Sequence, residues 1–153
     1  MLVTLDPHPA DACHIRLLAG HGANGQPVFE VLPALRRDTD LFVLTGSPGL
    51  VLGCAAGDLL RVSEGGAFEV ADQGANVCVQ AFREEGFTPE QFAGLKEAAG
   101  FLGGLAEAPP NLRFIVVTIA RSAGLAAIEQ TLNGWAADVD GAEWWFGNVD
   151  EAA

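Results

Sequence analysis

The hydrophobic pattern is clearest over residues 112–119, where it predicts a buried strand. Apolar side chains occur on both alternation faces of this stretch, with Phe114 and Val116 on one face and three β-branched residues on the other. A strand that is apolar on both faces is typical of a sheet covered from two sides. We therefore predict that residues 112–119 form a central strand.

The rest of the second half alternates between strand and helix patterns. Residues 77–83 alternate as a strand, and a helix is predicted to begin at Pro89 because Thr88 can cap it and Gln91 completes a capping box. A second helix is predicted to begin near Ser122, since its apolar residues recur at alternating spacings of three and four. Short strands are expected at residues 105–108 and 142–149.

The resulting order is strand, helix, strand, strand, helix, strand, which is the order of a ferredoxin-like βαββαβ unit. In that fold the first and third strands are central, and here residues 77–83 and 112–119 are the strands that are apolar on both faces. Both helices of such a unit cover the same face of the sheet. The apolar residues of the other face therefore need a second cover, which we expect from the first half of the chain.

The first half carries β patterns only, with turn residues about every ten positions. Such a pattern predicts a small barrel or a curled sheet. Residues 50–57 are small and apolar but too interrupted by glycine to form a helix or a strand. The predicted fold class is α+β, in which a β-rich half (residues 1–73) packs on a ferredoxin-like half (residues 74–153) as one cooperative unit. Strands of the first half are expected at residues 14–19, 27–35, 41–45, 59–62 and 67–70.

Composition narrows the class of protein. The longest apolar runs are far shorter than the ~20 residues of a membrane helix, and the N-terminus lacks a signal-peptide pattern. We therefore expect a cytoplasmic protein with no membrane partner. The three cysteines, Cys13, Cys54 and Cys78, have no metal-ligand or CxxC spacing, which indicates reduced thiols in a reducing compartment.

The charge balance is strongly acidic. The net charge is −12, from 20 acidic and 8 basic residues, and Lys96 is the single lysine. Such a surface repels nucleic acid and anionic lipid, so neither is expected as a partner. A basic protein would be attracted instead, with an encounter rate raised roughly ten- to a thousandfold at low salt. Solubility alone is the alternative explanation of the charge.

No motif for catalysis, a cofactor or a metal is found. Residues 20–25 match GxGxxG, but Gln26 and Pro27 lead into a strand, whereas the dinucleotide motif needs a helix at that point. A glycine-rich hairpin loop is the better interpretation. The histidines are scattered and form no HExxH-like pattern, so a zinc site is not expected; they are His8, His14 and His21.

Acidic pairs and two adjacent tryptophans are the candidate partner-binding residues. The acidic pairs lie in predicted turns and at helix ends, where solvated surface is the alternative interpretation. Adjacent tryptophans on an edge strand must point to opposite faces, so one of them can face solvent unless both are core residues. An aromatic anchor with an acidic rim is typical of an interface hot spot. The candidates are Asp38, Asp40, Glu84, Glu85, Asp138, Asp140, Glu143, Trp144 and Trp145.

Two segments carry a resemblance to a known family. Residues 47–62 read SPGLVLGCAAGDLLRV, and residues 141–150 read GAEWWFGNVD. The proline-containing turn, the small apolar run, the Gly-Asp strand start and the aromatic ending before Gly-Asn-Val resemble a family of small bacterial proteins designated domain of unknown function 4265. The resemblance implies no established activity.

Small size, acidic charge and the missing catalytic motif lead to one main hypothesis. The chain is expected to be a cytosolic immunity protein that binds a cognate basic toxin or effector domain and occludes its active site. One alternative is a ligand-sensing or regulatory ferredoxin-like module. Another is a small hydrolase or lyase that uses Glu84, Glu85 or Asp58 together with a histidine.

Overall fold

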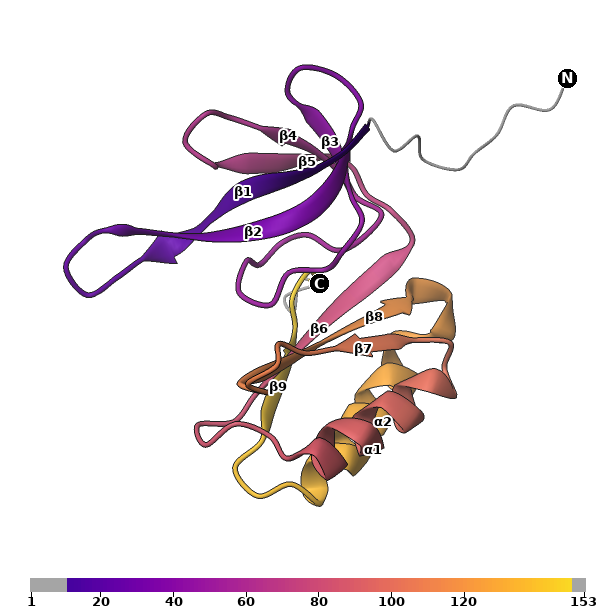
Figure 1. The fold of residues 1–153 in the computed structure, drawn as a ribbon. Helices are drawn as coiled ribbons and strands as arrows, with labels where there is room; N and C mark the ends of the chain where they lie inside the picture. The colour runs from indigo at the N-terminus through magenta and orange to yellow at the C-terminus, as the bar shows by residue number, and fades with distance from the viewer. Residues whose placement is uncertain (1–10, 150–153) are drawn as a thin grey trace, which may run out of the picture.

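The computed structural model describes residues 11–149, which form two antiparallel sheets and two α-helices. His8 lies outside the described residues. The first sheet has five strands in the order β1-β2-β3-β4-β5, and the second has four in the order β7-β8-β6-β9. The fold is therefore α+β, with the strands of the first sheet all preceding those of the second in the chain (Figure 1).

The N-terminal sheet is a curled meander. Its strands are β1 (Ala12–His21), β2 (Pro27–Arg36), β3 (Leu41–Leu44), β4 (Leu59–Val62) and β5 (Phe68–Asp72). Of the two predicted shapes, the small barrel is wrong, because β1 and β5 are the edge strands of this sheet. The backbone N–H of Leu18 in β1 reaches only the turn between β4 and β5, where it donates to the carbonyl of Gly66 at 2.9 Å.

The lengths of the strands explain why the sheet stays open. The first two strands have ten residues each, whereas β3, β4 and β5 have only four or five. The far part of the β1–β2 hairpin therefore projects beyond the other strands (Figure 1), and β5 is too short to pair along β1. Residues 20–25 lie at the tip of this hairpin, as expected for a loop and not for a dinucleotide site.

The C-terminal half contains β6 (Asn76–Phe82), α1 (Pro89–Gly100), β7 (Leu105–Glu107), β8 (Phe114–Ala120), a 3-10 turn η2 (Arg121–Ala123), α2 (Leu125–Ala137) and β9 (Glu143–Phe146). The predicted central pair is confirmed, because β6 and β8 pair in register and occupy the middle of the sheet. The predicted capping box is also present: Gln91 N donates to Thr88 Oγ1 at 3.1 Å, and Thr88 N donates to Gln91 Oε1 at 2.9 Å.

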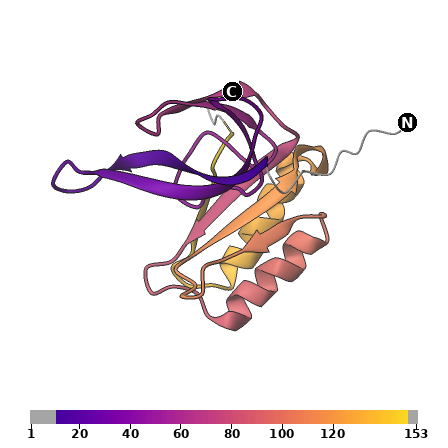
Figure 2. The ribbon, with the colours of Figure 1, turned by 45° about the horizontal axis from the view of Figure 1, so that its top comes forward.

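The two faces of the C-terminal sheet are buried by different elements. One face packs against both helices, with fully buried Val79 and Val117 in contact with the cluster that includes Leu95 and Leu132. Figure 2 shows the helices on this side of the sheet and the N-terminal half on the opposite side. The expectation that the first half covers the second face is therefore confirmed.

The cover itself is the loop of residues 45–58 between β3 and β4. This loop faces both halves: Val51 and Cys54 belong to the core of the N-terminal sheet, whereas Ala55 packs against Val116 of β8. Its backbone also joins the C-terminal half, because Gly53 N donates to the carbonyl of Gly147 at 2.7 Å. The small side chains of the loop allow this close approach of backbone to sheet.

No helix among the described residues has both the length and the apolar character needed to cross a membrane.

Candidate functional site

The predicted partner-binding residues fall into two separate groups. Asp38 and Asp40 lie in the turn between β2 and β3, in the N-terminal half. The other seven lie in the turns after β6 and α2 and in strand β9, in the C-terminal half (Figure 1). The structure therefore does not bring all nine candidates to one surface.

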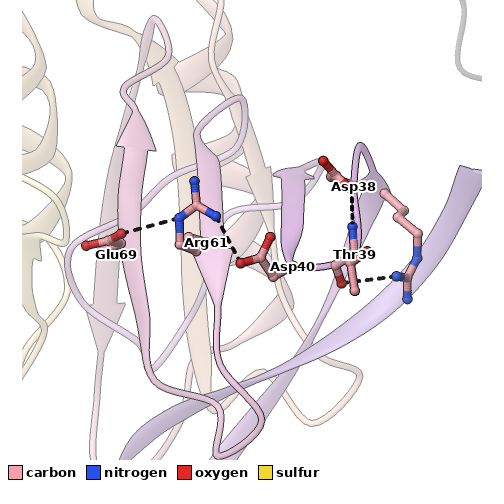
Figure 3. Close-up of polar contacts among 6 residues, drawn as sticks. Asp38, Thr39, Asp40, Arg61 and Glu69 are labelled. Carbon is pink, nitrogen blue, oxygen red and sulfur yellow. Dashed lines mark hydrogen bonds and ion pairs between the residues drawn. The ribbon is translucent and has the colours of Figure 1, made fainter.

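The carboxylates of the N-terminal group have local partners. Asp38 Oδ1 accepts the backbone N–H of Thr39 at 2.7 Å. Asp40 Oδ2 accepts Arg61 Nη1 at 2.9 Å, and Arg61 Nε lies 3.5 Å from Glu69 Oε1 (Figure 3). Since these ion pairs are largely exposed, each contributes little to stability. They do, however, tie the β2–β3 turn to β4 and β5.

Five exposed carboxylates gather at one end of the C-terminal sheet, and we call this group the acidic end. Arg83 holds the two turns that carry them together: its Nε donates to the carbonyl of Asp140 at 2.7 Å, and its Nη1 donates to the carbonyl of Gly86 at 2.8 Å. Its Nη2 pairs with Glu85 at 2.9 Å. The acidic end consists of Glu84, Glu85, Asp138, Asp140 and Glu143.

The adjacent tryptophans of β9 point to opposite faces of the sheet, as predicted. Trp144 Nε1 donates to Asn133 Oδ1 on α2 at 3.0 Å, and its ring meets Phe146 edge-on at 5.2 Å between centroids. Trp145 Nε1 donates to Gln80 Oε1 at 2.7 Å on the other face. Both tryptophans are half-buried, so neither is a fully exposed anchor and neither is a full core residue. They line a hollow of about 470 Å³ beside edge strand β9.

A groove between the two helices is the feature that the sequence analysis missed. It has a volume of about 640 Å³ and runs along the exposed side of α1 and α2. Its lining includes Gly94, Phe101, Gly134, Trp135 and Asp138. The sequence signal for it is the presence of glycines inside both helical segments, where glycine is unfavourable.

Asp58, the candidate for acid–base chemistry, is a structural residue of the loop. It is 1 % exposed, and its two oxygens accept backbone N–H groups, from Ala55 at 2.9 Å and from Gly74 at 2.7 Å. Both oxygens are thus occupied within the fold. A small pocket of about 220 Å³ lies between the halves, lined in part by Glu30, Ser47 and Glu107.

The cysteines and histidines form no recognisable reactive centre within residues 11–149. Burial raises the pKa of Cys54 and of Cys78 to about 12, with nearby Asp58 and Glu30 respectively as further causes. Both thiols are therefore protonated at neutral pH. No group of three or more histidine, cysteine, aspartate or glutamate side chains within this range is arranged to hold a metal ion.

A family model described as "Domain of unknown function (DUF4265)" matches residues 30–144. The chain belongs to this family. The DUF4265 match begins within β2 and ends within β9, so it includes both helices, the strands from β3 to β8 and the whole acidic end, whereas β1 precedes it. The resemblance noted in the sequence is thereby confirmed.

One solved structure similar to this DUF4265 protein is that of a hypothetical protein from Neisseria gonorrhoeae. The two chains are 12 % identical and superpose with a TM-score of 0.61, over 88 % of this chain and 92 % of the other. At this identity the likeness shows that the fold is shared and nothing more. The search of curated proteins gives no match to the chain.

Proposed function

We propose that this DUF4265 protein is an immunity protein that binds a cognate antibacterial toxin or effector domain and occludes its active site. The proposed partner is a basic protein, and the proposed location is the cytoplasm, where an inhibitor can meet a toxin that enters the cell. The observation that carries the proposal is the gathering of exposed carboxylates at the acidic end, beside the tryptophans of β9, on a chain with a net charge of −12.

Electrostatics supports a basic partner over the other macromolecules. The carboxylates of the acidic end are exposed, and Arg83, which neutralises Glu85 in part, has a side chain only 19 % exposed. The field at this end of the molecule is therefore negative. Such a field steers a basic partner to the surface and raises the association rate, whereas affinity depends on the apolar contacts inside the rim.

Trp144 and Trp145 are the proposed aromatic anchors. Half-buried aromatic rings are already held in place by the fold, so little conformational entropy is lost when a partner covers them. Hot-spot residues are enriched in tryptophan and are surrounded by a rim that excludes water. A standard interface buries about 800 Å² per partner, and the acidic end together with the hollow beside β9 is proposed as its centre.

For the C-terminal half we propose a ferredoxin-like arrangement. Its element order is strand, helix, strand, strand, helix, strand, and its antiparallel sheet has the order β9-β6-β8-β7, with both helices packed on one face. The alternative function, a ligand-sensing module, receives less support. The pocket between the halves, at about 220 Å³, is smaller than the ~300 Å³ at which small-molecule sites usually begin.

The proposal is tested with the protein encoded by the gene immediately upstream. Co-expression and co-purification should give a stable complex, and expression of the neighbour alone should stop bacterial growth. Binding kinetics at low and high salt should show an association rate that falls as salt rises. The proposal fails if the neighbour neither binds the protein nor harms the cell.

A charge-matched pair of variants locates the binding surface. The test variant reverses Asp138, Asp140 and Glu143 to lysine, and the control reverses three exposed carboxylates of the N-terminal half, Glu64, Glu69 and Asp72. Both variants change the net charge equally. The test variant should slow association at least about tenfold and the control much less. Equal effects would show that only net charge matters and would exclude the acidic end as the site.

A further inference from the structure

The groove between α1 and α2 is open because each helix has a glycine, and therefore no side chain, on the exposed side where the groove runs. A Cβ added at Gly134 would meet no atom within 4 Å, and one added at Gly94 would meet only Trp135 Cδ1, at 3.8 Å. Glycine inside a helix is less favourable than alanine, because it loses more conformational freedom on folding. The two glycines therefore leave an open space above a floor that includes Trp135 and Val139.

Away from the acidic turns, the α1 side of the groove is apolar, and Gln130 and Thr131 of α2 line the other side. Phe101, which follows α1, is 83 % exposed, more than any other large apolar side chain among the described residues. Leu102 and Ala98 continue the apolar lining. Together these side chains form one contiguous apolar surface, and contiguous exposed apolar surfaces mark binding sites, whereas scattered single residues do not.

The opposite end of the groove is negative. Glu90 and Asp138 are the charged residues of the lining, and no lysine or arginine of the described chain lines it. Asp138 also belongs to the acidic end, so the groove opens directly onto that surface. Lys96 lies over the ring of Phe92, at 5.4 Å from its centroid, and does not neutralise the lining carboxylates.

We propose that this groove binds a basic amphipathic helix of a partner protein. An apolar side chain of that helix is seated between Gly94 and Gly134, and a lysine or arginine lies at Glu90 and Asp138. The inference deepens the proposed function, on which the identity of the partner as a basic toxin or effector rests. The length fits: α1 has 12 residues and so spans about 18 Å, equivalent to about three turns of a bound helix.

Charge disfavours a second copy of this chain as the occupant. In a symmetric dimer through the groove, Glu90 and Asp138 of one copy would meet either the apolar end of the other groove, which offers them no cation, or the same carboxylates of the other copy. Like charges brought together in this way cost free energy, and a chain with 8 basic residues against 20 acidic ones offers little to offset it. Sedimentation of the protein alone should therefore show no dimer that forms through the groove.

Synthetic peptides test the groove without knowledge of the natural partner. The probe is a leucine–lysine amphipathic helix of about 15 residues, the length at which isolated helices become marginally stable. One comparison peptide carries glutamate in place of lysine, and another carries serine in place of leucine. Titration followed by NMR should move the amide signals of Gly94 and Gly134 and the indole signal of Trp135 with the first peptide only.

Two matched glycine variants test whether the peptide binds in the groove. Gly134→Phe fills the groove. The control, Gly100→Phe, places the same side chain at the end of α1, outside the lining of the groove. At both positions an added Cβ meets no atom within 4 Å. Gly134→Phe should weaken peptide binding at least about tenfold, and Gly100→Phe should leave it unchanged. Gly134→Ala checks that a side chain at this position is compatible with folding.

The charge requirement is tested with Glu90→Gln combined with Asp138→Asn. This variant should weaken the lysine peptide severalfold and reduce the salt dependence of its binding. Equal binding by the Gly134→Phe and Gly100→Phe variants, no saturable binding, or a dimer disrupted by Gly134→Phe would each overturn the inference. If the peptide binds as expected but the upstream-encoded protein neither binds nor harms the cell, the proposed function fails while the groove remains a site for basic helices.

Discussion

Gln80 and Trp145 share a hydrogen bond that joins the edge of the C-terminal sheet to the cover on its second face. Trp145 Nε1 donates to Gln80 Oε1 at 2.7 Å, and Gln80 Nε2 donates to the carbonyls of Pro48 and Val51 at 2.9 and 3.0 Å. Gln80 is 2 % exposed. A buried amide with all these partners is strongly specified in position, and it links β9 to the loop of residues 45–58.

Replacement of Gln80 by leucine is expected to destabilise the protein. The change keeps the size of the side chain but removes the partner of the Val51 carbonyl and of the Trp145 indole N–H. The Pro48 carbonyl keeps only the weak thiol donor of Cys78, at 3.4 Å. Unsatisfied buried groups cost about 1–3 kcal/mol each, so the free energy of unfolding should fall by about 2–4 kcal/mol. Urea denaturation measures this change in the free energy of unfolding. The control is Gln73→Leu, at an exposed position, which should change stability by no more than about 0.5 kcal/mol.

The sequence was sufficient to place β6 and β8 at the centre of a sheet, because apolar residues on both faces of a strand need two covers. It did not reveal the part played by Gln80. The acceptors of its amide lie 29 and 32 residues away, in a loop without periodicity. Whether a polar residue in an apolar strand meets water or a buried carbonyl depends on such distant contacts, which local patterns do not contain.

Replacement of Glu30 by glutamine should loosen the covering loop. The Glu30 carboxylate accepts three successive backbone N–H groups: Gly49 N at 2.7 Å, Leu50 N at 3.0 Å and Val51 N at 2.9 Å. A glutamine would turn an NH₂ group toward one of these donors. The expected loss is about 1–3 kcal/mol, together with faster hydrogen exchange at these three amides.

The matched control for Glu30 is Glu69→Gln. Glu69 is an exposed glutamate whose closest ionic partner, Arg61, lies at 3.5 Å. Its replacement should change stability by less than about 0.5 kcal/mol. If both variants unfold at the same urea concentration, the three contacts of Glu30 do not hold the loop.

Asp58→Asn separates a structural role from a catalytic one. Because both oxygens of Asp58 accept buried N–H groups, an asparagine leaves one donor facing another, and stability should fall by about 2–4 kcal/mol. Asp72→Asn, at an exposed position, serves as the control and should have little effect. Unchanged stability in Asp58→Asn would contradict the structural role of Asp58 and would favour the hydrolase or lyase alternative.

Part of the candidate site was predictable and part was not. The opposite orientation of Trp144 and Trp145 follows from strand geometry alone. The acidic end depends on Arg83, whose acceptor on Asp140 is 57 residues away, so proximity along the chain could not group these residues. The groove was not predicted, because helical periodicity identifies the buried face of a helix, whereas the glycines that open the groove lie on the exposed face.

The two halves are predicted to unfold together. The loop of residues 45–58 contributes Val51 and Cys54 to one core and Ala55 to the other, so neither half keeps its packing when the other unfolds. Hydrogen exchange near the unfolding midpoint should give the same opening free energy for the amides of Leu17 and Leu60 as for those of Val79 and Val117. A lower value confined to the first pair would show that the N-terminal sheet opens on its own.

The reactivity of the three thiols tests which of them are buried in the fold. Alkylation at pH 8 in the native state should modify the half-buried Cys13 and spare Cys54 and Cys78 until urea unfolds the chain.

Stability at alkaline pH should depend on the two buried thiols, because burial raises the pKa of Cys54 and of Cys78 to about 12 in the folded protein. Because the unfolded state loses these protons first, their stabilising contribution is complete below about pH 9 and is lost as the pH rises toward about 12. Urea midpoints should therefore fall between pH 9 and pH 10.5, and a Cys54→Ala and Cys78→Ala double variant, although less stable at pH 7, should show a smaller fall. Parallel falls in both proteins would mean that other groups cause the alkaline loss.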